Sequence, residues 1–509
     1  MITSTQREAT EPAGAFAAVA DVAGASATLV VNLLGHVEQL VGDAVDDALD
    51  VARECTELWE VTTERVNDVA RAMRAAPRFA RIAGELIRII AAYRWHAAIS
   101  GGAESSDSDA AALDALHAHS AERLYALCVE LRGGVLKLGQ FASTRIDLLP
   151  AAYVTALSRL QDRVPPVPAP LITARVADEL GAPVESIFAR FDSEPIAAAS
   201  LAQVHAAELA DGTRVAVKVQ VPGIEDVVET DIAAMSIAVP TLRDLLPFVD
   251  GDTVAEELTR ALRAELNYVA EAEHAMAFAR LFADDPDVVV PRVYRALSTR
   301  RVLVLEQLAG ERLTDYLDAC EQRGTTGADD RDRIFTILLR AFCAQVLEHG
   351  LLQGDPHPGN FLVLPGDAGP RLALLDFGCV QAYGPARRRA YAELCLATLR
   401  GDAERMAALF EAMGFRSRDG GCDALRAFAD LLLGAFRADA TLAVQDIDAR
   451  AAMERILRLT RENPIVAVPG DFVLLGRVFT ALGGLLMRYR PRVNLFQLLM
   501  PPLLRAMQG

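Results

Sequence analysis

The spacing of apolar and polar residues is helical in the first third of the chain. Residues 12–100 are rich in alanine, and over 79–98 apolar residues recur at helical spacing with Arg81, Arg88 and Arg94 among them. The small, polar and acidic stretch 100–110 has the composition of a flexible linker. A second helical block is predicted over 111–148, ending before Pro150.

The spacing changes to that of strands after the proline-rich stretch 164–170. A short helix over 171–181 is followed by three short apolar or alternating runs, IFARFD, VHAAEL and RVAVKVQV, with an Asp211-Gly212 turn between the last two. A helical block is predicted over 252–283 and two strand-like runs around 288–306. From about residue 331 the pattern is mainly helical, interrupted by FLVL and LALLDFG.

Strands followed by helices predict an α+β fold with the two lobes of a protein-kinase-like domain. We expect a helical N-terminal region with linker over residues 1–110 and a further helical extension over 111–170. The smaller lobe is expected over 171–310 and the larger lobe, with a helical C-terminal extension, over 311–509.

Charge and cysteine content narrow the choice of partner and compartment. The chain has 509 residues and a formal net charge of -18, which disfavours nucleic acid as a partner. Its seven cysteines include no CxxC pair, which favours free thiols over a disulfide framework or a zinc site. The polar N-terminus does not resemble a secretory signal. We therefore expect a cytoplasmic protein.

Two apolar stretches raise the question of a membrane. Residues 15–35 are apolar except for Asp21 and Asn32, and we expect a helix that is buried in protein or lies on a membrane. The run 472–489 contains Arg477 and several glycines, which favours a packed helix over a membrane span. Whether residues 15–35 touch lipid stays open, and a peripheral position at the inner face of a membrane is compatible with them.

Four residues in order along the chain have the spacing of a kinase nucleotide site. Lys218 lies inside an apolar strand, so it needs an anion nearby or a solvated tip at a sheet edge. Asp355 and Asn360, five residues apart, have the spacing of a kinase catalytic loop, and Asp376 opens a DFG tripeptide after an apolar strand. The segment between Asp355 and Asp376 has room for one hairpin. Together the four predict a site for ATP or ADP with Mg²⁺, in which Asp355 is catalytic and Asn360 and Asp376 bind the metal.

Further motifs resemble those of the ABC1/ADCK/UbiB family of atypical kinases. The segment LRGGVLKLGQFASTR (131–145) contains a KxGQ signature, and EPIAAASLAQVHAA (194–207) resembles the alanine-rich loop that stands where other kinases have a glycine-rich one. LSRLQDRVPP (157–166) and AELNYVAEAEHA (264–275) also match the family pattern. The resemblance covers roughly residues 115–385. It implies that the extension over 111–170 holds the KxGQ helix.

The resemblance assigns further residues to the nucleotide site. Lys218 is expected to bind phosphate and to pair with Glu271, while Glu265 is expected to approach Lys137. The remaining residues of the nucleotide site are those of the alanine-rich loop and of the KxGQ signature: Ala197, Ala198, Ala199, Ser200 and Gln140. The methyl groups of the loop should make it stiffer than a glycine-rich loop and keep it farther from the phosphates.

Two residues depart from the family pattern. Gln353 stands where relatives often have His, and a structural adjustment without loss of activity is expected. Asn267 stands where an aspartate is usual, which removes a negative charge beside the expected Glu265–Lys137 pair. This second change puts the regulation of the site in question.

The function implied is a Mg²⁺-dependent atypical kinase or ATPase that supports isoprenoid-quinone or related lipid metabolism. The short segment after DFG, without Ala-Pro-Glu, disfavours a conventional protein kinase. Partners would be nucleotide, a membrane lipid or quinone-like molecule, and other proteins. Two alternatives stay open: a nucleotide-gated scaffold that binds lipid or a partner, and a small-molecule kinase of the aminoglycoside or choline type.

Overall fold

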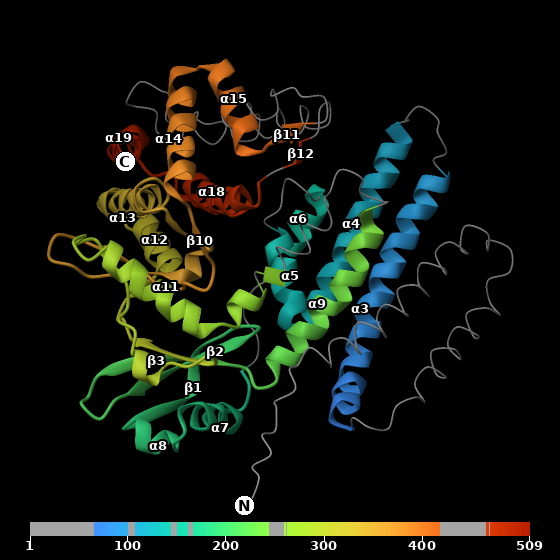
Figure 1. Ribbon diagram of the computed structural model, residues 1–509. Helices are drawn as coiled ribbons and strands as arrows, with labels where there is room; N and C mark the ends of the chain where they lie inside the picture. The colour runs from blue at the N-terminus through green and yellow to red at the C-terminus, as the bar shows by residue number, and fades with distance from the viewer. Residues whose placement is uncertain are drawn as a thin grey trace, which may run out of the picture.

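The computed structural model describes residues 66–99, 107–143, 150–160, 166–243, 259–260, 262–417, 465–467 and 469–508. The expected apolar helix over 15–35 lies outside these residues, as does part of the linker expected over 100–110. The described chain is a mixture of helices and small sheets (Figure 1).

A group of helices from the first half of the chain packs side by side, visible on the right of Figure 1. Its apolar interior includes Ile82, Leu127 and Leu157. The members are α3 (Val66–Ile99), α4 (Asp107–Leu131), α5 (Gly133–Ser143), α6 (Ala151–Leu157) and α9 (Ile224–Arg243).

The helical block expected over 111–148 is interrupted. Arg132 and Gly133 both have positive φ, 55° and 59°, and this break separates α4 from α5. Within α5, a Cβ at Gly139 would lie 2.5 Å from Leu160 Cδ1 and 2.7 Å from Cys128 Sγ. A hydrogen at this position therefore lets α5 approach its neighbours closely.

A four-stranded antiparallel sheet follows, in the order β1-β2-β3-β5. Lys218 lies in β3, between β2 and β5, so it is not a solvated edge-strand lysine. The sheet and the elements beside it are β1 (Arg190–Ala198), β2 (Ala202–Glu208), β3 (Arg214–Gln220), β5 (Val302–Glu306), α7 (Ala169–Leu180), α8 (Val184–Ile187), α11 (Tyr268–Leu281) and the 3-10 turn η1 (Arg295–Leu297). Buried valines of β3 and β5 pack on α7 and α8.

A second sheet has the order β4-β9-β8-β6, with a parallel β4–β9 pair and the expected β8–β9 hairpin. A two-stranded ribbon, β7 with β10, flanks the catalytic-loop segment. The bounds are β4 (Val288–Val289), β6 (Glu311–Arg312), β7 (Leu351–Gln353), β8 (Phe361–Leu364), β9 (Arg371–Leu374), β10 (Val380–Ala382) and the 3-10 turn η3 (Pro358–Asn360).

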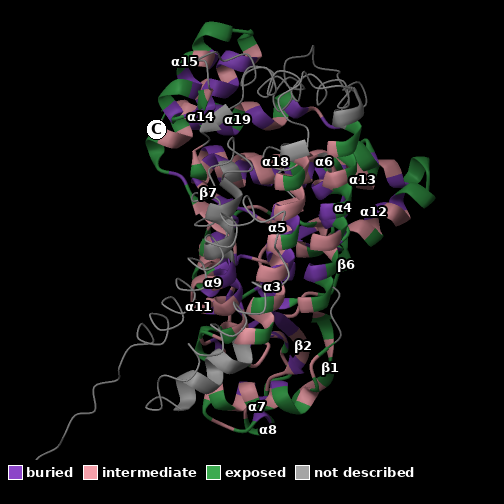
Figure 2. Ribbon diagram, turned by 90° about the vertical axis from the view of Figure 1, so that its right-hand side faces the viewer, coloured by how far each residue is buried: buried purple, intermediate pink, exposed green. Residues whose placement is uncertain are grey.

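Helices from the second half of the chain enclose the largest apolar cluster, which includes Phe335, Phe377 and Leu503. In Figure 2, buried and exposed residues alternate along these helices, and exposed ones lie on outer turns such as those of α15. The elements are α12 (Leu313–Gln322), α13 (Thr325–Cys343), the π-helical turn η2 (Ala344–His349), α14 (Pro385–Arg400), α15 (Ala403–Met413), β11 (Arg416–Ser417), β12 (Ile465–Ala467), α18 (Gly470–Tyr489) and α19 (Leu495–Gln508).

Among the described residues, one helix, α18, is long enough and apolar enough to cross a membrane, judged by length and composition only. Its residues Leu475, Val478 and Leu482 belong to the large apolar cluster. That packing agrees with the expectation of a packed helix over 472–489.

Candidate nucleotide and magnesium site

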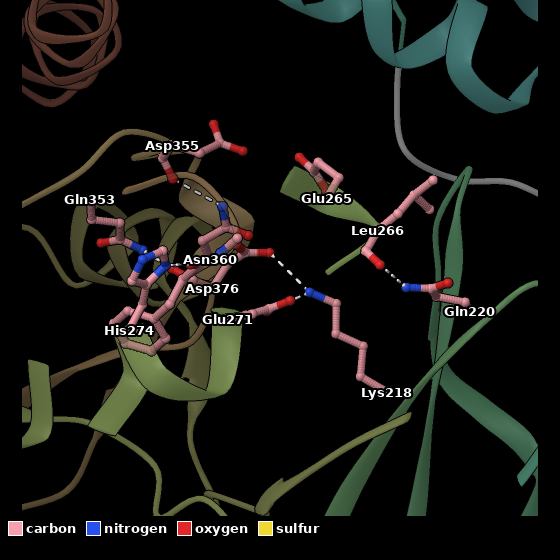
Figure 3. A network of polar contacts seen from close by, with 12 residues as sticks. Lys218, Gln220, Glu265, Leu266, Glu271, His274, Gln353, Asp355, Asn360 and Asp376 are labelled. Carbon is pink, nitrogen blue, oxygen red and sulfur yellow. Dashed lines mark hydrogen bonds and ion pairs between the residues drawn. The ribbon is translucent and has the colours of Figure 1, made fainter. Parts of the chain in front are cut away.

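Lys218 reaches from β3 to two carboxylates. Its Nζ lies 2.6 Å from Glu271 Oε1 and 3.4 Å from Asp376 Oδ2. Figure 3 shows the side chain pointing toward both, with Asn360 and Asp355 beyond them. The ring of Tyr268 lies below the ammonium, 5.1 Å from Nζ to the centroid. The lysine expected to bind phosphate thus lies beside the DFG aspartate, as a kinase nucleotide site needs.

Burial and charge act in opposite directions on these groups. Burial lowers the pKa of Lys218, but Asp376 and Glu271 raise it well above its usual value. Burial raises the pKa of Glu271 to about 7, against the opposing effect of Lys218. Burial also raises the pKa of Asp376, yet Lys218 and the Gly378 amide bring it below its usual value. Two carboxylates share one ammonium, so the site favours a further cation.

Glu271 is held in the first turn of α11. The side chain of Asn267 caps this helix, and its Oδ1 accepts a hydrogen bond from the Ala270 amide at 3.3 Å. Glu271 is 2 % exposed. Asn caps helices about as well as Asp, so the substitution at Asn267 keeps the geometry of α11.

The catalytic-loop segment is held by hydrogen bonds from its own side chains. Asn360 Nδ2 donates to the Asp355 carbonyl at 2.9 Å, and Gln353 Nε2 donates to the Asp376 carbonyl at 2.6 Å. The Leu375 amide donates to the Asn360 carbonyl at 3.0 Å. Hydrogen bonds therefore join the loop to the DFG segment, and one of them comes from the Gln353 side chain.

The donor set suits a magnesium ion that is bound mainly through phosphates. The Asn360 side-chain nitrogen donates to the Asp355 carbonyl, so the amide oxygen is the atom that Asn360 could offer to a metal ion, beside the Asp376 carboxylate. No group of three or more His, Cys, Asp or Glu side chains forms a metal site in the part of the chain that the structure describes. Two oxygen donors with the rest supplied by nucleotide and water is the usual arrangement for Mg²⁺.

The KxGQ segment contacts the same site from α5. Lys137 Nζ lies 2.9 Å from Glu265 Oε1, the pair that the resemblance implied. Gln140 Nε2 donates to the Leu160 carbonyl at 3.3 Å, which joins α5 to the chain just after α6. Gln140 therefore has a structural contact, and its assignment to the nucleotide stays a prediction.

The helical block expected over 252–283 is interrupted between Glu265 and Glu271. The described chain is helical over 262–265, turns at Leu266 and starts α11 at Tyr268. The two glutamates lie on separate helical segments, because the first segment ends at Glu265 and Asn267 caps the start of α11.

The alanine-rich loop forms the turn between β1 and β2. The Ala199 amide donates to the Ala202 carbonyl at 2.8 Å, and Ser200 is buried in the turn. In the ladder, Ala197 lies opposite Val204, which lies opposite Lys218. Two strand spacings put Ala197 about 10 Å from Lys218. Ala198 is the next residue in β1, opposite Gln203.

A cation from α18 reaches Asp355, the residue expected to be catalytic. Arg477 of α18 donates from Nη2 to Asp355 Oδ1 at 2.7 Å. Sequence reasoning treated Arg477 only as a charge that interrupts an apolar run. A charged residue in the middle of an apolar helix was the one local signal that could have drawn attention to it.

The segment after DFG is short, as expected. β10 ends at Ala382 and α14 begins at Pro385. α18 lies next to this segment, and Tyr383 donates its hydroxyl to the Asp471 carbonyl at 3.1 Å. The described chain therefore has no long activation segment between β10 and α14.

Comparison with known proteins agrees with this geometry. The model of the ABC1 atypical kinase-like domain matches residues 159–410. A chloroplastic protein of Arabidopsis thaliana, ACTIVITY OF BC1 COMPLEX KINASE 8, is 32% identical over 397 residues, 72% of this chain and 51% of that protein. This chain thus spans about half the length of that relative.

Two further relatives extend the comparison. An uncharacterized protein of Synechocystis is 37% identical over 299 residues, 57% of this chain and 72% of that protein. A solved Mycobacterium tuberculosis protein, in complex with erythromycin, is 26% identical and has a TM-score of 0.55, covering 78% of this chain and 99% of its own.

Proposed function

This chain belongs to the ABC1 atypical kinase-like family, and from that premise we propose that it is an ATP-binding atypical kinase or ATPase of the UbiB type. The observation that carries the proposal is Lys218 bridging Glu271 and Asp376 beside a loop that bears Asp355 and Asn360. Binding sites for small molecules other than nucleotides do not need a lysine, an aspartate, an asparagine and a second aspartate in this order along the chain.

Each residue has a distinct part in the proposed activity. Lys218 would hold the α- and β-phosphates of ATP, with Glu271 fixing the lysine. Asn360 and Asp376 would hold Mg²⁺, which supplies charge neutralisation of the phosphates. Asp355 would accept the proton of the attacking hydroxyl or water. Positioning and electrostatic stabilisation would supply most of the rate, as is usual for phosphoryl transfer.

We also propose a two-lobed arrangement in which α5, as the KxGQ helix, lies on the side where the acceptor binds. The Lys137–Glu265 pair supports a role for α5 as a cover over the region where a conventional kinase docks peptide. A water molecule or a small acceptor would fit such a site better than a protein substrate. The alanine-rich loop would keep Ala197, Ala198 and Ala199 farther from the phosphates than a glycine-rich loop.

We further propose a role in isoprenoid-quinone or related lipid metabolism, at the inner face of a membrane. Membership of the family supports this role. The alternative of a nucleotide-gated scaffold uses the same residues for binding and differs in the absence of turnover.

The test is Mg²⁺-dependent ATP hydrolysis by the purified chain. It is run with and without anionic liposomes, with a quinone-like phenol, and with erythromycin, the ligand of the Mycobacterium tuberculosis relative. We expect turnover that Asp376→Asn lowers by at least about 100-fold, because the metal loses a charged ligand. Tight Mg-ADP binding without turnover under all of these conditions would favour the scaffold instead.

A further inference from the structure

The catalytic loop is contacted by one face of α18. A Cβ at Gly354 would lie 2.4 Å from Leu474 Cδ2, so the loop and this helix are in close contact. One helical turn further along α18, Arg477 Nη2 donates to Asp355 Oδ1 at 2.7 Å. Two successive loop residues therefore meet two residues on the same face of one helix.

The start of α18 is fixed where it meets α14. Asp471 pairs with Arg387 at 2.7 Å, and the Tyr383 hydroxyl donates to the Asp471 carbonyl. Phe472 is buried, and its ring centroid lies 4.8 Å from that of Phe415. These contacts restrict sliding and rotation of the helix, so the guanidinium of Arg477 is held in one position.

The pair is largely shielded from solvent. The side chain of Arg477 is 13% exposed and that of Asp355 is 18% exposed. Burial lowers the pKa of Arg477, but Asp355 and nearby carboxylates raise it above its usual value. A guanidinium stays charged under all ordinary conditions. A partly buried, fixed cation on one oxygen of a carboxylate restricts that carboxylate to one orientation.

We propose that Arg477 is a positioning residue that holds Oδ1 of Asp355, so that Oδ2 faces the attacking oxygen. This inference rests on the proposed function. In the reaction, the acceptor oxygen forms a bond to the γ-phosphorus while the bond from that phosphorus to the β–γ bridging oxygen breaks. The proton of the acceptor passes to Asp355 Oδ2, and ADP leaves with the bonding electron pair.

Arg477 lies outside the matched ABC1 domain, which ends at residue 410. The catalytic loop would then depend on a helix that the domain match does not include.

The experiment compares Arg477→Gln and Arg477→Lys with the unchanged protein in steady-state Mg-ATP hydrolysis. We expect Arg477→Gln to lower kcat by about 10- to 100-fold, because the carboxylate loses its orientation. The KM for ATP should stay within about threefold, since phosphates and metal are held elsewhere. Arg477→Lys should recover part of kcat. Arg488→Gln is the matched control, because Arg488 lies on the same helix and pairs with Asp318 at the surface.

A double-mutant cycle separates positioning from a general structural role. If Arg477 acts through Asp355, then Arg477→Gln should cause no further loss when added to Asp355→Asn. Three results would each overturn the inference. They are additive losses of kcat in the double mutant, a kcat for Arg477→Gln equal to or above that of the unchanged protein, and an effect of Arg477→Gln on KM alone. An unchanged protein that binds Mg-ATP without turnover overturns the proposed function as well, whereas turnover with an unaffected Arg477→Gln overturns only the positioning role.

Discussion

At the scale of single residues, the two departures from the family pattern, Asn267 and Gln353, both make hydrogen bonds that support the site. Asn267 caps α11 through its amide oxygen, so the loss of a carboxylate does not remove the cap that holds Glu271 in the first helical turn. Gln353 donates to the Asp376 carbonyl and so supports the DFG segment. The expectation that the missing charge at Asn267, beside the Glu265–Lys137 pair, affects regulation stays a prediction.

His205 in β2 provides a residue-scale prediction about pH. It is fully buried, its Nδ1 lies 2.8 Å from the Asp192 carbonyl, and its Nε2 lies 3.2 Å from Gln203 Nε2. Neutral imidazole can donate to the carbonyl and accept from the amide, whereas protonation removes the acceptor. Burial lowers the pKa of His205 below its ordinary value of 6.5.

Because the pKa of His205 is lowered in the folded protein, acidification destabilises the fold. Above pH 6.5 the stability from neutral His205 is complete, and it is lost as the pH falls toward the lower folded-state pKa. Each pKa unit corresponds to about 1.4 kcal/mol. We therefore expect the melting temperature of His205→Gln to fall less than that of the unchanged protein between pH 7.5 and 5. The exposed His119→Gln should follow the unchanged protein, and parallel curves for all three would contradict the prediction.

The residues of the site differ in how far sequence could predict them. Lys218, Asp355, Asn360 and Asp376 belong to short segments whose local pattern carries the signal. Arg477 meets Asp355 across 122 positions, and that contact depends on how α18 packs. Pairing of this kind is a tertiary property, and no local spacing encodes it.

At the scale of elements, the junction of α4 and α5 determines where the KxGQ helix lies. Arg78 of α3 donates to the carbonyls of Leu131 and Arg132, at 2.7 and 2.9 Å, and so satisfies the end of α4. Its Nε also lies 2.6 Å from Asp231 Oδ1. The carboxylate of Asp231, in turn, accepts a hydrogen bond from the Val135 amide in the first turn of α5 at 3.0 Å.

This arrangement predicts a large loss of stability for Arg78→Gln. Asp231 is fully buried, and without Arg78 its charge has only backbone partners. Breaking a buried pair by removing one member costs about 3–5 kcal/mol. We expect a clear drop in the thermal unfolding midpoint, measured by circular dichroism. Arg88→Gln is the control, because Arg88 is mostly exposed, and an equal drop in both variants would refute the role of the buried pair.

The same junction explains why element boundaries were harder to predict than element types. The alternation of apolar residues correctly indicated β2 and β3 and the β8–β9 hairpin. Two long helical blocks were expected where the chain breaks at Arg132 and at Asn267. Arg132 adopts a positive φ that its residue type disfavours, and contacts from α3 compensate for it. Sequence alone does not reveal such compensation.

At the scale of the whole molecule, three distant parts of the chain meet at one site. α5 supplies Lys137, the sheet and α11 supply Lys218 and Glu271, and α18 supplies Arg477. A ligand that binds between these parts should stabilise all of them together, because it binds the folded chain only.

Mg-ADP should therefore raise the unfolding temperature of the whole described assembly. At a concentration 100 times its Kd, one bound ligand adds about 2.7 kcal/mol. We expect a shift of several degrees in calorimetry that requires both magnesium and nucleotide and is lost in Asp376→Asn. Asp367→Asn, in the exposed β8–β9 turn, should keep the full shift. A shift of the same size in Asp376→Asn would show that the nucleotide binds elsewhere.

The packing of α19 has a practical consequence for anyone who shortens this protein. Leu503 is fully buried in the same apolar cluster as Phe377 of the DFG segment, and Arg505 pairs with Glu348 at 2.7 Å. A fragment trimmed to the matched domain at residue 410 would expose that cluster and leave Asp355 without its guanidinium. Poor solubility or lack of activity in such a fragment would result from the truncation and would not describe the activity of the longer chain. The expressed protein should extend through residue 508, and purification tags should be placed where they do not contact α19.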